Sequence, residues 1–186
     1  MSGPTWISTG QLGVAERVLG RTVRRPAGHL RDGGLVVGLE RSCTAVFRSD
    51  AGDPFPGDPD VRRLRAQTVT LAGLLTAHSP GYEPPQVPDR SARALAQAHC
   101  HQHAVQGWDA DRELLSRAGG DAERLGSGCC GLAGNFGFEP RHLDVSEACA
   151  ERVLPPAAGG GRGHGGTGGA AGLRTARGGR QRALTP

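Results

Sequence analysis

Three short segments with strand character alternate with helical segments in the first 154 residues, and a cysteine follows each of them. Strands that alternate with helices predict an α/β fold in which helices surround a small, mostly parallel sheet. Ligands of such sheets gather beyond the carboxyl ends of the strands, so we expect the cysteines to converge on one edge. The strand–cysteine pairs are residues 35–39 with Cys43, residues 93–98 with Cys100, and residues 122–125 with Cys129 and Cys130.

The segments between these strands have apolar residues at helical spacing. Glycine pairs and prolines separate them, as at Gly119-Gly120, where a helix is expected to end. The first expected helix begins after an N-cap at Ser8 or Thr9. Further helices are expected over residues 42–49, 61–77, 109–118 and 142–154.

The composition changes after Leu154. Residues 155–186 contain 11 glycines, five arginines, no acidic residue and no aromatic residue. Such a segment cannot bury enough apolar surface to offset its loss of chain entropy, which predicts a disordered Gly/Arg-rich tail. We therefore expect one folded domain over residues 1–154.

The net positive charge of the chain comes from this tail. The whole chain has a formal net charge of +4, but residues 1–154 contain 17 basic and 18 acidic side chains. A nearly neutral domain does not favour a basic face for nucleic acid, so no nucleic-acid partner is expected.

The sequence predicts that the protein resides in a reducing compartment. The N-terminus lacks the basic and apolar regions of a secretory signal, and no stretch has the length and apolarity of a membrane span. We therefore expect a cytoplasmic protein with reduced thiols. An odd number of cysteines, five, also fits poorly with a closed disulfide framework.

The vicinal pair Cys129–Cys130 is the strongest chemical signal. Adjacent cysteines rarely bond to each other, because a vicinal disulfide strains the backbone, whereas adjacent thiolates can ligate a multi-iron cluster. Glycines recur every third residue around the pair, at positions 128, 131, 134 and 137. Gly131 and Gly134 are the predicted cofactor-binding glycines, since they let the backbone approach inorganic sulfur and direct N–H groups at it.

Other interpretations of these cysteines compete with a cluster. Cysteine and histidine at close spacing, as in His99-Cys100-His101-Gln102-His103, also bind zinc, which would make the chain a structural or interaction domain. The chain has no C-x-x-C pair, the spacing that zinc sites and thiol–disulfide enzymes commonly use. Cys149 lies in a predicted helix and is interpreted as a small apolar residue.

Three motifs together resemble one known family. The run Ser127-Gly128-Cys129-Cys130-Gly131, followed by Gly134-Asn135-Phe136-Gly137-Phe138-Glu139, resembles the cysteine-rich CCG domain of FAD-linked oxidases and iron–sulfur oxidoreductases. His99-Cys100-His101-Gln102-His103 is similar to the preceding motif of that domain. Leu39-Glu40-Arg41-Ser42-Cys43 resembles its Glu-Pro-Ser-Cys motif, with Arg41 in place of proline.

The resemblance implies an iron–sulfur electron-transfer module of the D-lactate dehydrogenase or glycolate oxidase type, which acts on 2-hydroxy acids. Its cluster, of the [4Fe-4S] type, would be held by Cys43, Cys100, Cys129 and Cys130. FAD would lie on another domain or subunit, and a ferredoxin-like cluster domain would be a second partner. A quinone acceptor would bring peripheral membrane association.

The chain also departs from the family pattern. Complete members carry two CCG repeats, whereas this chain has one, and Gly3-Pro4-Thr5-Trp6 resembles the segment that comes after the first repeat in those members. The resemblance therefore implies a C-terminal fragment, truncated at its N-terminus, that is not expected to catalyse a reaction alone. A degenerate, inactive gene product is the remaining alternative.

Overall fold

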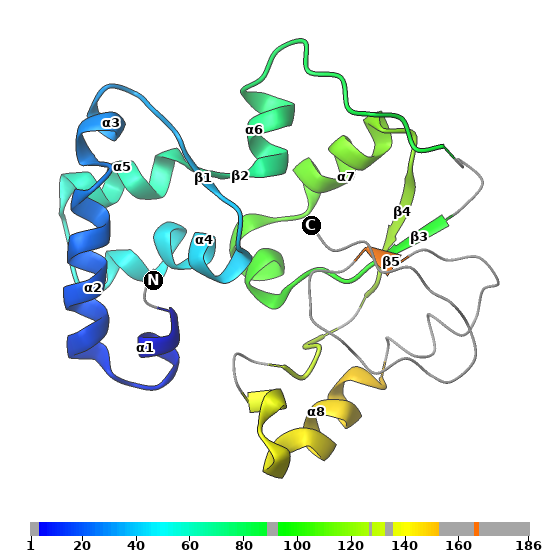
Figure 1. Ribbon diagram of the computed structural model, residues 1–186. Coiled ribbons are helices and arrows are strands. Elements are labelled where there is room, and N and C mark those ends of the chain that lie inside the picture. The colour runs from blue at the N-terminus through cyan, green and yellow to red at the C-terminus, as the bar shows by residue number, and fades with distance from the viewer. Residues whose placement is uncertain (1–3, 89–92, 127, 133–135, 153–165, 168–186) are drawn as a thin grey trace. The chain divides into compact units, whose positions relative to one another are not determined.

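The computed structural model describes residues 4–88, 93–126, 128–132, 136–152 and 166–167 (Figure 1). The chain divides into two units, and each is described by itself. Unit 1 consists of residues 1–82 and 101–110, and unit 2 of residues 83–100 and 111–186. The range predicted as one domain thus contributes to both units.

Unit 1 is mainly helical and contains a two-stranded parallel sheet. Its strands are β1 (Val36–Gly38) and β2 (Thr68–Thr70). Its helices are α1 (Pro4–Ser8), α2 (Leu12–Arg24), α3 (Ala27–Arg31), α4 (Arg41–Arg48), η1 (Asp50–Gly52), α5 (Pro59–Gln67), α6 (Leu71–Ala77) and the π-helix η2 (Gln102–Gln106).

The core of unit 1 lies among α2, α3, η1 and α5. Apolar residues recur at helical spacing along α2 and α5, so each helix turns one apolar face inward. Half-buried Val36 and two phenylalanines, Phe47 and Phe55, pack against this core. The buried members of the cluster are Val23, Leu30, Ala51, Val61 and Leu64.

The prediction of one helix over residues 61–77 is wrong. Residues 68–70 form β2 instead, in register with β1 from Val36↔Thr68 to Gly38↔Thr70. Two β-branched threonines flank Val69, and such residues favour extended backbone. Thr70 then starts a new helix, because its side-chain oxygen accepts a hydrogen bond from Gly73 N at 3.0 Å.

Unit 2 contains a three-stranded parallel sheet in the order β4–β3–β5 (Figure 1). Helix α7 (Asp109–Arg117) begins in unit 1 and continues into unit 2. The strands are β3 (Arg93–Ala96), β4 (Asp121–Arg124) and β5 (Gly166–Thr167). After β4 come the 3-10 turns η3 (Phe136–Phe138) and η4 (Pro140–His142) and helix α8 (Leu143–Ala150).

The predicted α/β class is confirmed, with helices around small parallel sheets. The strands expected within residues 35–39, 93–98 and 122–125 are all present, but the described strands form two sheets rather than one. Residues 166–167 of the predicted disordered tail pair with β3, and the rest of that tail lies outside the described residues. Among the helices that the structure describes, none combines the length and apolarity needed to cross a bilayer.

Candidate functional site

Two of the predicted cysteine positions follow neighbouring strands of one sheet. β3 and β4 are parallel and in register up to Ala96↔Arg124, and the pairing continues through a bond from Leu125 N to Ala96 O at 2.9 Å. Cys100 and Cys129 come shortly after the carboxyl ends of these two strands. Both segments therefore leave the same edge of the sheet, where ligands of parallel sheets bind.

A side-chain contact links the two segments beyond this edge. Gln97 Nε2 donates a hydrogen bond to the carbonyl oxygen of Gly128 at 3.4 Å. Gln97 lies three residues before Cys100, and Gly128 directly precedes Cys129. The hydrogen bond thus links the segment before Cys100 to the segment before Cys129. No sequence pattern indicated a role for Gln97.

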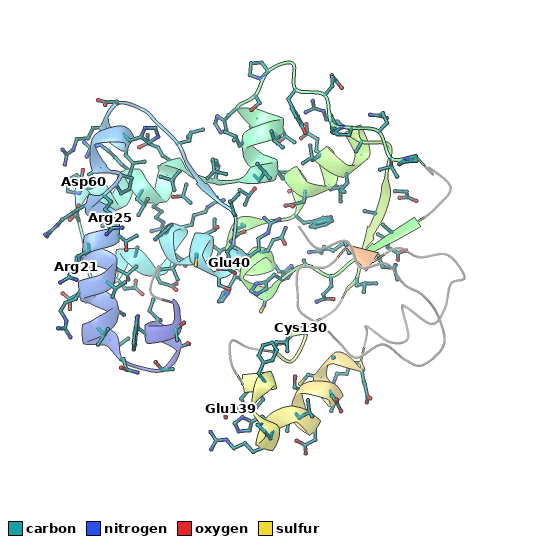
Figure 2. All side chains as sticks on the ribbon, viewed as in Figure 1. Arg21, Arg25, Glu40, Asp60, Cys130 and Glu139 are labelled. Carbon is teal, nitrogen blue, oxygen red and sulfur yellow. The ribbon has the colours of Figure 1, made fainter. Side chains whose placement is uncertain are left out.

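The vicinal pair lies in a turn that requires glycine at its end (Figure 2). Gly131 has a φ of +87°, which side chains of L-residues rarely adopt, and its N–H donates a hydrogen bond to Cys129 Sγ at 3.3 Å. A Cβ at Gly131 would also collide with the carbonyl oxygen of Ser146 in α8. Conformation and packing thus account for this glycine, and its predicted cofactor role stays a prediction. Gly134 lies outside the described residues.

The thiols of unit 2 are accessible. All five cysteines lie in the described part of the chain as reduced thiols, with Cys100 and Cys129 exposed and Cys130 half-buried. Within the described residues, however, no three His, Cys, Asp or Glu side chains gather closely enough to hold a metal ion. The structure therefore brings the segments of Cys100 and Cys129–Cys130 to one sheet edge without closing a site around them. Cys43 follows β1 of the other sheet, so the prediction that all of these cysteines converge on one sheet edge is wrong for Cys43.

Cys43 belongs to unit 1 and lies three residues after Glu40, which is labelled in Figure 2. The Glu40 carboxylate caps α4 by accepting hydrogen bonds from Ser42 N at 2.8 Å and Cys43 N at 2.7 Å. Burial acts to raise the pKa of Glu40, but hydrogen bonds from the Cys43 thiol and from Ser42 outweigh it and lower this pKa. The Glu-x-Ser-Cys run is thus a helix cap that also holds the Cys43 thiol as a hydrogen-bond donor.

The histidine-rich run is divided between the two units. His99 and Cys100 belong to unit 2, whereas His101 and His103 belong to unit 1. In unit 1, Gln106 at the end of η2 donates a hydrogen bond from Nε2 to the carbonyl oxygen of Arg41 at 2.6 Å. This bond links the end of η2 to the start of α4.

A cluster beside α8 has no sequence signature. The rings of Phe136 and His142 stack with centroids 4.1 Å apart and planes at 6°. Glu139 accepts a hydrogen bond from Arg141 Nε at 2.9 Å, and its Oε2 lies 3.2 Å from His142 Nδ1. These contacts hold η3 and η4 close to the start of α8. Cys149 lies within α8 and is half-buried.

Three comparisons with known proteins identified no relative: no protein-family model, no curated protein and no solved structure matches this chain.

Proposed function

We propose that this chain is an iron–sulfur electron-transfer module of a flavin-linked oxidoreductase that acts on 2-hydroxy acids. One observation carries the proposal most directly: Cys100 and the vicinal pair follow adjacent parallel strands, and the Gln97–Gly128 hydrogen bond links their approaches. The other support is the resemblance of the three cysteine motifs to the CCG domain. The proposed cellular location is the cytoplasm.

The donor chemistry of unit 2 fits an iron–sulfur cluster. Three thiols of which two are exposed supply soft ligands, and iron–sulfur clusters are held by such thiolates. Metal binding is commonly coupled to folding, so closing of residues 97–100 and 128–131 around the cluster belongs to the proposal. When bound, the cluster would supply reversible one-electron transfer.

The chain's own residues would hold and tune this group. Cys100, Cys129 and Cys130 are the ligands that unit 2 offers, and the N–H of Gly131 already donates to Cys129 Sγ. Hydrogen bonds to ligand sulfur stabilise the anionic thiolate and tune cluster potential. Cys43 is the fourth proposed ligand, and it would have to give up its hydrogen bond to Glu40 to bind iron as a thiolate.

The remaining parts of the reaction are proposed for partners. A flavin-binding domain or subunit would deliver the electrons, and a ferredoxin-like cluster domain or a quinone would accept them. The substrate would be bound on the flavin partner, so the proposal assigns no catalytic residue to this chain.

Anaerobic purification with iron and sulfide analysis tests the proposal. We expect a brown protein with iron and acid-labile sulfide in equal amounts, and loss of both in Cys129→Ser and Cys130→Ser. Cys149→Ser is the matched control, because Cys149 is half-buried in α8 and is not a proposed ligand. A colourless protein with stoichiometric zinc would overturn the proposal.

A further inference from the structure

We propose that Ser146 of α8 is a positioning residue that sets the orientation of the Cys129–Cys130 pair. The role of the pair as a ligand rests on the proposed function, but the packing that carries the inference does not. Ser146 is only 5% exposed and lies in a helix whose neighbouring residues, Val145 and Glu147, are exposed. Its small side chain is therefore turned inward.

Ser146 packs against two glycines, Gly131 at the end of the cysteine turn (residues 128–131) and Gly137 in η3. A Cβ built at Gly137 would lie 2.5 Å from Ser146 Oγ. A Cβ at Gly131 would meet the carbonyl oxygen of Ser146 first and would lie 2.9 Å from its Oγ. Gly131 and Gly137 are both buried. Helix and turn thus approach each other more closely than any side chain at 131 or 137 would permit, and a larger side chain at 146 would push them apart.

The contact reaches the thiols through the backbone of Gly131. The N–H of this residue makes the 3.3 Å hydrogen bond to Cys129 Sγ, and Gly137 N is bonded to Leu132 O at 2.9 Å. Moving Gly131 relative to α8 would therefore move the N–H group that donates to the Cys129 side chain. Because Cys130 lies between Cys129 and Gly131, the same movement changes its exposure.

The test compares two leucine substitutions on α8 in the full, metal-free chain kept anaerobic with a chelator. Ser146→Leu places the large side chain against the turn, whereas Ala148→Leu places it on an exposed position of the same helix. The readout is the iodoacetamide alkylation rate of each cysteine by peptide mass spectrometry. We expect Ser146→Leu to change the rates at Cys129 and Cys130 by about tenfold and Ala148→Leu to leave them unchanged.

Internal references separate displacement of the turn from unfolding. Cys43 in unit 1 and Cys149 in α8 should keep their wild-type rates in Ser146→Leu, and Ser146→Ala should keep wild-type rates at all five cysteines. Equal rates at Cys129 and Cys130 in Ser146→Leu and Ala148→Leu would overturn the inference.

A second pair of variants covers the case in which Ser146→Leu unfolds unit 2 and raises the Cys149 rate as well. Gly137→Ala adds one methyl group that would lie 2.5 Å from Ser146 Oγ, 2.9 Å from Leu132 Cα and 3.1 Å from Gly131 O, and we expect a smaller change at Cys129 and Cys130 in the same direction. Adding Ser146→Gly should reverse part of that change, and a double variant identical to Gly137→Ala would overturn the inference. Because no iron is present, the result is independent of whether the chain binds a cluster. A positive result in a chain that binds no iron would leave the inference standing and remove the proposed function.

Discussion

Units 1 and 2 differ in how they are held together. Of the 13 buried hydrophobic residues in the described part of the chain, 11 lie in unit 1 and include leucines and valines from four helices. Unit 2 contributes two alanines, Ala96 and Ala150. It also exposes large apolar side chains on η3 and α8, which are Phe136, Phe138, Leu143 and Val145, while unit 1 exposes Leu12, Leu39 and Leu71.

The larger apolar core lies in unit 1, whereas three of the four proposed ligand cysteines lie in unit 2. Unit 1 has buried leucines and valines from four helices, and burial of such side chains stabilises a fold. Among its described residues, unit 2 has no such core, and it is the unit that carries Cys100, Cys129 and Cys130. Small folds with weak cores commonly gain stability from bound metal. We therefore expect bound metal to stabilise unit 2 and, in unit 1, to affect only the start of α4, where Cys43 lies.

The largest expected effect comes from the core of unit 1. Leu64 is 1% exposed, so Leu64→Ala should lower the free energy of unfolding by about 2–5 kcal/mol. Leu95→Ala in β3, where the leucine is half-buried, should cost about 1 kcal/mol. Urea denaturation of the metal-free chain followed by circular dichroism measures both. Equal losses would contradict the view that the units differ in their cores.

In unit 2, substitution of Gly131 tests how tightly the cysteine turn is packed. Gly131→Ala should destabilise the cysteine turn by about 2 kcal/mol, because φ is +87° and the methyl group would meet Ser146. Gly128→Ala is the control, since no atom lies within 4 Å of its Cβ position. Thermal unfolding of the iron-loaded protein compares the variants, and similar midpoints for both would refute the role of the turn.

Loss of the α4 cap should have a smaller effect, confined to unit 1. Glu40→Ala should cost about 1 kcal/mol, since the carboxylate accepts bonds from Ser42 N and Cys43 N. The lowered pKa of Glu40 means that the unfolded chain takes up the proton first. The stabilisation is therefore present above the ordinary pKa near 4.5 and is lost as pH falls through the lowered value.

Urea denaturation between pH 3 and pH 7, about the range over which a carboxyl group titrates, checks this pH dependence. Glu40→Gln should flatten the acid part of the profile relative to the wild type, and Glu40→Asp should keep it. An unchanged profile in Glu40→Gln would show that another carboxylate is responsible.

The smallest effect is expected at an exposed ion pair of unit 1. Arg31 Nη2 lies 2.6 Å from Asp60 Oδ2, and the hydrogen bond from Arg31 is the main cause of the lowered pKa of Asp60. Arg31→Ala should raise that pKa toward its ordinary value, as an NMR titration can measure, while the unfolding midpoint moves less than in Glu40→Ala. A larger shift than in Glu40→Ala would mean that this surface pair matters more than the cap.

Local sequence patterns predicted most elements but not their partners. The apolar run at 35–39 and the helix that Gly119-Gly120 ends are local signals, and both elements are present. β2 was missed because residues 61–77 have helical spacing throughout, and only pairing with β1 stabilises the strand at 68–70. The division into two sheets depends on the same long-range pairing.

The candidate site shows the same limit. The placement of Cys100 and Cys129 after strands followed from sequence alone, because a strand end is a local property. Gln97, Gln106 and Ser146 were not found, since each acts through one contact with a residue distant in the sequence or with a glycine backbone. Such contacts leave no periodicity for a sequence pattern to reveal.

Hydrogen exchange with and without bound iron and sulfide tests the central claim most directly. Loading with iron and sulfide should protect amides in β3, β4 and residues 128–132 and leave exchange in α2 and α5 of unit 1 unchanged. Cys129→Ser should abolish this gain, whereas Cys149→Ser should retain it. Exchange that is identical with and without iron and sulfide, or protection that rises equally in both units, would contradict the claim that unit 2 is the part of the chain organised by a cluster.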